Sequence, residues 1–195
     1  MASTTVAPET LDLLFHDELH RYELVDGELR SKPMVSILHS LLMTHLGSLL
    51  LAAIRELDRD EELWVLTDPL ARIRTDHWRR PDVAVLRAED AEEEKYVMPG
   101  HWPVLCIELV SIPDQTVGEL LDKCKLYHAQ GVRHCWVLEP ESRTAWAYDN
   151  DDSQPKQIAA DGQLTASSLG IELKLDEIWR GLHNKRGNKT GRKKR

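Results

Sequence analysis

The stretch Pro103-Val-Leu-Cys-Ile-Glu-Leu-Val-Ser111 decides the fold, because it has the composition of a buried strand and carries an acid, Glu108, in its interior. Aliphatic and β-branched residues on both sides are typical of a strand inside a sheet. A buried carboxylate without a partner is costly, so we expect Glu108 to be paired, protonated or bound to a metal ion. On an edge strand the same side chain would instead alternate outward to solvent.

A second acid and a lysine stand in related places. In Arg80-Pro-Asp-Val-Ala-Val-Leu86, Asp82 opens another apolar, β-branched run, and a helical segment with Lys123 follows Glu108. Two acids on strands and a nearby lysine can hold a divalent cation together with an anionic oxygen. Taken singly, Asp82 has a plainer interpretation as an exposed acid after proline. Lys123 alone would be a solvated charge on the flank of a helix.

Composition bounds the architecture. The chain has 195 residues, of which 42% are hydrophobic and 30% charged, which indicates one globular domain with a sizeable core. Cys106, Cys124 and Cys135 form no C-x-x-C pair and stand in apolar contexts, so we expect buried spacers. No secretory leader pattern is evident, and the longest apolar tract, around Leu49 to Ile54, is too short to span a bilayer. We therefore expect a cytoplasmic protein without a membrane segment.

The net charge of -8 conceals a basic end. Residues 185–195 carry seven basic side chains and no acid, which leaves -15 for the rest of the chain. Such an acidic body binds polyanions poorly unless metal ions neutralise part of it, and the basic end could offset this at a phosphate backbone. The alternative is a solvated, disordered terminus. We expect a flexible N-terminus at 1–9, one domain at 10–180 and a basic disordered tail at 181–195.

The order of predicted elements gives the fold class. Asp26-Gly27 predicts a hairpin within 22–29, and Ser36 is a candidate N-cap for a helix whose apolar residues recur from Leu38 to Leu57. The other predicted elements are a helix at 11–19, strands at 63–73 and 81–86, a solvated charged loop or short helix at 89–95, a helix at 117–130 stopped by Gly131, and strands at 134–138 and 144–148. We therefore expect an α+β (α/β) fold with a central mixed β-sheet flanked by helices.

An ordered set of motifs resembles the Uma-two family of the PD-(D/E)XK nuclease superfamily, whose members have a restriction-endonuclease-like core. The resemblance spans roughly residues 10 to 180. Its motifs are Tyr22-Glu-Leu-Val-Asp-Gly-Glu-Leu29, His39, Arg80-Pro-Asp-Val-Ala-Val85, Ile107-Glu-Leu-Val-Ser111, Lys123 with Leu126-Tyr127, Gly131-Val132 and Trp136-Val-Leu-Glu-Pro140. Each motif alone is weak, and their order gives the resemblance its strength.

The resemblance implies a magnesium site, with manganese as a substitute. By position, Asp82 and Glu108 become the metal ligands, and the backbone carbonyl of Leu109 the third. Val110 occupies the lysine position of the E-x-K strand, so the resemblance assigns the catalytic lysine to Lys123 on the following helix. The helical period favours Lys123 over Lys125, because Lys123 borders the apolar face. His39 and Glu28 also match family positions and are candidate accessory residues, whereas Glu23 is a candidate for fixing the hairpin.

The implied activity is metal-dependent hydrolysis of DNA phosphodiester bonds by an endonuclease. Cutting both strands of a duplex needs two active sites, so we expect a homodimer. Two other hypotheses remain open. One is a catalytically silent nucleic-acid-binding or regulatory protein of the same fold. The other is a structural protein in which the acids only form salt bridges, such as Glu108 with Lys123.

Overall fold

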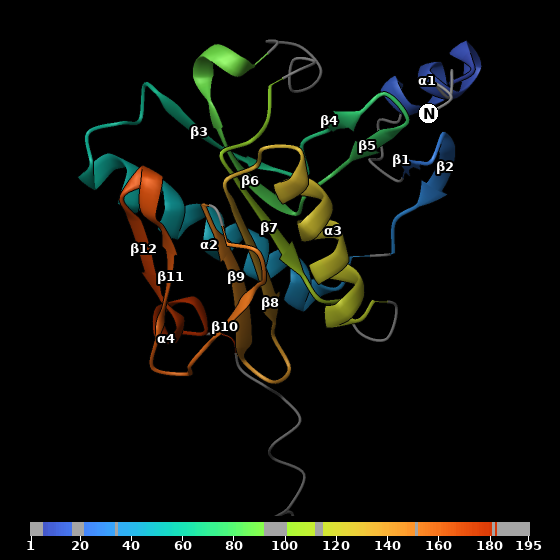
Figure 1. Cartoon of the computed structure of the whole chain (residues 1–195). Coiled ribbons are helices and arrows are strands. Elements are labelled where there is room, and N and C mark those ends of the chain that lie inside the picture. The colour runs from blue at the N-terminus through green and yellow to red at the C-terminus, as the bar shows by residue number, and fades with distance from the viewer. Residues whose placement is uncertain are drawn as a thin grey trace, which may run out of the picture.

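The computed structural model describes residues 6–16, 22–33, 35–91, 101–111, 115–150, 152–180 and 182. Six strands form the central sheet: β3 (Leu63–Thr67), β6 (Val83–Arg87), β7 (Leu105–Leu109), β8 (His134–Glu139), β9 (Thr144–Asp149) and β10 (Lys156–Ile158). Their order is β10-β9-β8-β7-β6-β3, and β7 and β8 run parallel while the other neighbours run antiparallel. The long helix α2 (Ile37–Glu56) covers one face and α3 (Val117–Ala129) the other (Figure 1). The predicted fold class is confirmed.

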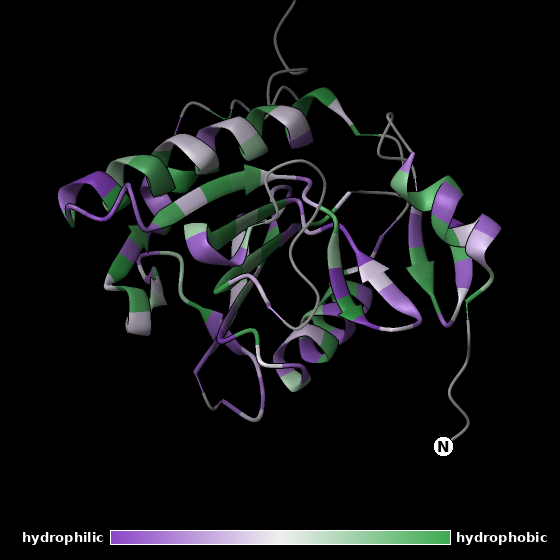
Figure 2. Cartoon of the chain, turned by 90° about the horizontal axis from the view of Figure 1, so that it is seen from above, coloured by the Kyte–Doolittle hydropathy of each residue, from purple (hydrophilic) through white to green (hydrophobic). Residues whose placement is uncertain are grey.

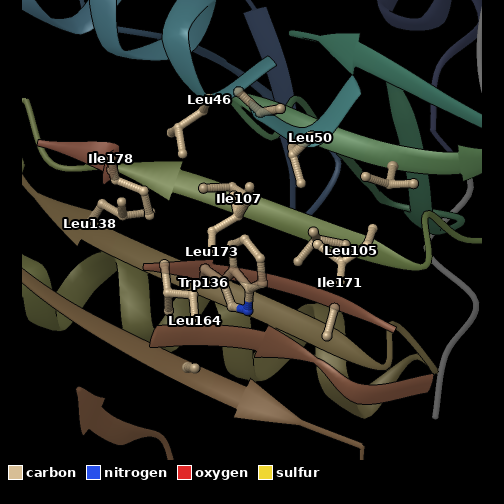
Figure 3. Close-up of a cluster of buried hydrophobic side chains, with 14 of the residues drawn as sticks. Leu46, Leu50, Leu105, Ile107, Trp136, Leu138, Leu164, Ile171, Leu173 and Ile178 are labelled. Atoms are coloured by element: carbon tan, nitrogen blue, oxygen red, sulfur yellow. The ribbon is translucent and has the colours of Figure 1, made fainter. Parts of the chain in front are cut away.

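Alternation of side chains along β7 positions Glu108. Leu105 and Ile107 point into the core that the sheet shares with α2 (Figure 3), whereas Cys106 and Val110 pack in the core under α3. Glu108 lies on the same side of the strand as Cys106 and Val110, so its carboxylate points toward α3. The strand is central and buried throughout, which excludes the interpretation of Glu108 as a solvated acid on an edge strand.

Helix α2 begins where the sequence predicts. The Ser36 hydroxyl accepts a hydrogen bond from the amide of His39 at 3.1 Å, which caps the helix. Of the recurring apolar residues, Leu42 and Leu46 are buried in the core and Leu49 and Ala53 pack against it, whereas Leu57 at the end of the pattern is exposed. Apolar residues occur on more than one side of this helix, so their spacing alone does not fix every buried position. The side chains that are buried are His39, Leu42, Leu46, Gly47, Leu50 and Ile54.

The composition of α2 is unusual for a helix of a globular domain. By length and composition alone this helix could cross a membrane, because an 18-residue window of it has a mean hydropathy of 1.8. Of the residues in that window, 33% are buried inside the protein. The sequence prediction considered only the uninterrupted tract from Leu49 to Ile54 and missed this property. Seen from above, α2 lies along the outside of the molecule (Figure 2). Much of this apolar helix is therefore at the surface.

A second, smaller sheet lies beside the first and has the order β2-β1-β5-β4. Its strands are β1 (Tyr22–Val25), β2 (Glu28–Ser31), β4 (Ala71–Arg74) and β5 (His77–Arg79), and helix α1 (Pro8–Phe15) packs against it. The predicted hairpin is confirmed: Asp26 and Gly27 have φ of 52° and 81°, as a tight turn of this type requires. Helix α1 starts at Pro8 and ends at Phe15, and residues 17–19 of the predicted helix lie outside the described residues.

The predicted strand from Leu63 to Ile73 is wrong as a single element. Asp68 adopts a φ of 54° and breaks it, so that β3 joins the central sheet and β4 joins the small one. The link carries the chain between the two sheets. Because both sheets then meet around Arg80, side chains from either can reach a common site.

Helix α3 matches its prediction closely. It starts at a capping box of Thr116 and Glu119, and Gly131, with a φ of 105°, follows its end.

The remaining elements complete the chain. The C-terminal ones are β11 (Gln163–Ala166), β12 (Ile171–Lys174) and α4 (Leu175–Ile178), and short 3-10 turns lie at Ala88–Asp90 and Ser167–Leu169. The three cysteines are buried and free, as predicted. Residues 92–95 of the charged segment and 183–195 of the basic tail lie outside the described residues, and the proposed division into flexible ends and domain stays a prediction.

Candidate active site

The two predicted acids lie side by side at the end of a strand pair. β6 and β7 pair antiparallel with Val83 opposite Ile107, so the next residues, Asp82 and Glu108, face each other. The Asp82 Oδ2 atom accepts a hydrogen bond from the amide of Leu109 at 2.8 Å. Only 6% of Asp82 and 2% of Glu108 is exposed, so Asp82 is not the exposed turn residue that its position after proline alone would favour.

Helix α3 supplies two partners of Glu108. The Nζ atom of Lys123 lies 3.0 Å and 3.1 Å from the two carboxylate oxygens. The Tyr127 hydroxyl donates a hydrogen bond to Oε1 at 2.8 Å. Lys123 and Tyr127 stand one turn apart and so share a face of the helix. Lys125 is exposed, in line with the preference for Lys123.

Glu23 is a third buried acid, which the sequence analysis assigned only to the hairpin. Its Oε1 atom accepts hydrogen bonds from Lys123 Nζ at 2.9 Å and from the amide of Arg80 at 2.8 Å, and Oε2 accepts one from Arg79 at 3.1 Å. It therefore ties the small sheet to α3 at the site. The signal was present, since Glu23 stands between apolar residues of a strand as Glu108 does.

His39 reaches Asp82 from the first turn of α2. Its Nε2 atom lies 3.2 Å from Asp82 Oδ1, and its Nδ1 atom lies 2.7 Å from the Ser111 hydroxyl. The imidazole is buried, with 6% exposed. His39 thus contacts both Asp82 and Ser111, so the structure brings it to this site, and its role as an accessory residue stays a prediction.

Burial and mutual repulsion set the charge states of the carboxylates. Burial raises the pKa of Glu108 to about 7; Lys123 opposes this, and the negative charges of Asp82 and Glu23 add to it. Glu23 is also buried, but Lys123 and Arg79 together lower its pKa to about 2. The neighbouring acids raise the pKa of Lys123 against the effect of its burial, so the lysine stays charged. Among these acids, Glu108 is the one that titrates near neutral pH.

These residues surround a cavity of about 470 Å³. Its walls come from α2, α3, both sheets and the segment after β2. The lining residues are Glu23, Arg30, Ser31, Lys32, Pro33, Val35, His39, Arg79, Asp82, Glu108, Ser111, Gln115, Glu119, Leu120, Asp122, Lys123 and Leu126. Glu28, the other predicted accessory residue, is exposed on β2 and does not line this cavity.

A second group of metal-ligand side chains lies at the hairpin turn. Asp26, Asp76 and His77 have ligand atoms within 4.8 Å of one another. The guanidinium of Arg74 contacts both acids, at 3.0 Å from Asp26 and 2.7 Å from Asp76, and also donates to His77 at 3.0 Å. A cation therefore already occupies the centre of this group.

The comparisons with known proteins concern the fold and the family of the chain. A search of curated proteins gives no match. The crystal structure of a "putative nuclease belonging to DUF820" from Anabaena variabilis ATCC 29413 is similar, with a TM-score of 0.73 and 19% sequence identity, and the match covers 90% of this chain and 100% of that one. At this identity the likeness concerns the fold. The family described as "Putative restriction endonuclease" matches residues 7–177, so the chain belongs to the Uma2 family, as its motifs predicted.

Proposed function

We propose that the protein is a magnesium-dependent endonuclease that hydrolyses DNA phosphodiester bonds, with Asp82, Glu108 and Lys123 as its catalytic residues. One observation carries the proposal. Two buried carboxylates, Asp82 and Glu108, line a cavity of about 470 Å³ together with Lys123, whose ammonium contacts Glu108. The family supports a nuclease function in general.

The donor set fits a hard divalent cation. The cavity is lined by five carboxylates, against the four cations Arg30, Lys32, Arg79 and Lys123. Burial first, and then the negative charges of Asp82 and Glu23, raise the pKa of Glu108, and a bound cation would favour its ionised form. Mg²⁺ prefers carboxylate and carbonyl oxygens. Asp82, Glu108 and the backbone carbonyl of Leu109 are the proposed ligands, and Mn²⁺ is a possible substitute.

The protein side chains have separable tasks in this proposal. When bound, the metal ion would acidify water and stabilise charge on the phosphate. Lys123 donates a hydrogen bond to Glu108 through its ammonium group. A phosphate oxygen in the cavity would compete for these N–H donors, so Lys123 can stabilise negative charge that develops on the phosphate. Glu23 holds the ammonium in place from the other side. Tyr127 and His39 orient Glu108 and Asp82.

The first test is cleavage of supercoiled plasmid by the purified full chain. We expect nicked or linear DNA with roughly 5 to 10 mM Mg²⁺ or Mn²⁺. EDTA should abolish the products. Complete absence of cleavage with either metal would count against the activity, and binding of DNA that persists in EDTA would then favour the silent nucleic-acid-binding protein.

Metal binding should stabilise the fold, and more at pH 8 than at pH 6. A metal ligand must be ionised, and the pKa of Glu108 is about 7. Without metal, the raised pKa of Glu108 lowers stability as pH rises from about 4.5 through 7. The lowered pKa of Glu23 makes stability rise between about pH 2 and 4.5, and its contribution is constant above that, so it does not interfere in this window.

The measurement is the melting temperature with and without Mg²⁺ at both pH values. At about 100 times the dissociation constant, bound metal adds about 2.7 kcal/mol, which is a shift of roughly 5 to 10 °C for a protein of this size. At pH 6 protons compete and the shift should be much smaller. Glu108→Gln should abolish the shift at both pH values. Equal shifts at pH 6 and pH 8, or none at either, would contradict the proposed ligand.

One observation favours the structural alternative. Both oxygens of Glu108 already contact Lys123, so the acids have partners without a metal ion. A protein in which these pairs serve only the fold would show no metal effect in the melting experiment. The nuclease proposal also includes two expectations from the sequence, namely that the protein is a homodimer and that it is located in the cytoplasm.

A further inference from the structure

The small sheet carries a cation to the mouth of the active-site cavity. β2 is the outer strand of this sheet (Figure 1), and Arg30 stands on it directly opposite Glu23 of β1. Residues opposite each other in an antiparallel pair project from the same face of the sheet. Glu23 contacts Lys123 from that face, at 2.9 Å. Arg30 therefore lies on the side of the sheet that faces the site, and it lines the cavity.

Arg30 differs from the other cations of the cavity in being available to a ligand. Lys32, Arg79 and Lys123 each form an ion pair with a carboxylate. Arg30 is exposed, and within the part of the chain that the structure describes no ion pair or side-chain hydrogen bond engages it. A guanidinium is always charged and presents N–H donors in a plane that matches two oxygens of a phosphate. Arg30 can therefore bind an anion without first giving up a partner among the described residues.

The helix on the other side of the cavity has the opposite charge. Glu119 and Asp122 of α3 line the cavity and are exposed. Exposed charges act on a neighbour over about 8 to 10 Å at ordinary salt concentrations. A polyanion at the mouth of the cavity is therefore repelled from the α3 side and attracted to the β2 side, where Arg30 stands. This polarity selects the side on which a nucleic acid strand passes.

A phosphate that is cut at this site has neighbours in the same strand. Asp82 and Glu108 are only 6% and 2% exposed, so a scissile phosphate has to enter the cavity to reach them, and the adjacent phosphates then lie at its mouth. We propose that Arg30 binds a phosphate adjacent to the scissile one, so that the site takes a polynucleotide strand with consecutive phosphates rather than an isolated phosphodiester. This inference rests on the proposed nuclease function and specifies its substrate.

The contact predicts different effects on two substrates. Bis(p-nitrophenyl) phosphate contains a single phosphate, so it reports the chemistry of the buried acids and cannot use Arg30. A contact that is kept from the bound substrate to the transition state changes KM and leaves kcat nearly unchanged. Arg30→Ala should therefore lower kcat/KM on DNA about tenfold through KM, as expected for the loss of a charged hydrogen bond. Hydrolysis of bis(p-nitrophenyl) phosphate with Mn²⁺ should stay within about twofold of the wild type.

Fluorescence anisotropy of a labelled duplex oligonucleotide with the full chain in Ca²⁺, which takes oxygen ligands as Mg²⁺ does, tests the contact without cleavage. Arg30→Ala should raise Kd about tenfold at low salt. It should also reduce the slope of log Kd against log salt by about 0.9, the value for one phosphate contact. Arg30→Lys keeps the charge and should keep the slope. The matched control is Arg55→Ala, because Arg55 is exposed in the last turn of α2, about 24 Å along the helix from His39.

The outcomes separate this inference from the nuclease proposal. Equal effects of Arg30→Ala and Arg55→Ala on Kd, an unchanged salt slope in Arg30→Ala, or no binding by the wild type at low salt would overturn the inference. A wild type that binds the oligonucleotide through Arg30 but cuts no DNA would support the contact and refute the turnover. Because Arg30 is exposed on an outer strand, its variants should melt like the wild type, which distinguishes a lost contact from a lost fold.

Discussion

Asp82→Ala and Glu108→Ala are each expected to lower the rate of metal-dependent plasmid cleavage at least about 1,000-fold, or roughly 4 kcal/mol of transition-state stabilisation. Each substitution removes one of two carboxylates that face each other in the register of β6 and β7. The fold should persist, because Lys123 keeps Glu23 as a partner. The measurement is the initial rate of plasmid nicking, together with the circular dichroism spectrum of each variant.

The matched control for this experiment is Asp122→Ala. Asp122 lines the same cavity but is exposed on α3, so its removal changes the charge of the site without removing a buried ligand. Its activity should stay within about threefold of the wild type, in keeping with a surface charge. If both Asp82→Ala and Glu108→Ala cleave DNA within tenfold of the wild type, these acids are not the ligands.

Lys123→Met should lower the free energy of unfolding by about 3 to 5 kcal/mol, because it leaves two buried carboxylates without their shared cation. In the structure, Lys123 contacts Glu108 at 3.0 Å and Glu23 at 2.9 Å, and its side chain is 10% exposed. For a chain of this size the loss corresponds to a melting temperature lower by roughly 10 °C. Cleavage should also be lost, since the same side chain is the proposed catalytic lysine.

Lys125→Met is the control for this second prediction. Lys125 stands two residues away on the same helix and is exposed, so the substitution has the same chemistry at a solvated position. Its melting temperature should change little. A Lys123→Met protein that melts like the wild type at pH 8 would show that the buried acids do not need the lysine.

The fold was predictable because its determinants are local. Ser36 caps α2, Thr116 and Glu119 cap α3, and Asp26-Gly27 makes the hairpin. Each of these signals spans only a few residues, and the structure contains the predicted cap or turn at the same residues. The motif order then identified the family. The break at Asp68 was not predictable in this way, because its φ of 54° follows from β3 and β4 joining different sheets.

The site was harder to predict, because its members lie far apart in the chain. Alternation along β7 and helical spacing on α3 place Glu108 and Lys123 on facing surfaces, and both are patterns of the sequence. Glu23 is a different case. It reaches Lys123 across 100 positions of the chain, and only the packing of the small sheet against α3 brings them together. Choosing between Glu23 and Glu28 needs the register of β1 with β5, which no local signal gives.

The shared lysine has a consequence for comparing relatives. Glu108, Lys123 and Glu23 join β7, α3 and the small sheet, so the atoms proposed for catalysis also hold separate parts of the molecule together. Natural selection on folding alone would then preserve these side chains after turnover had been lost. An intact set of these residues in another member of the family would consequently be poor grounds for inferring that it cuts DNA, and only a measured rate separates an active enzyme from an inactive descendant.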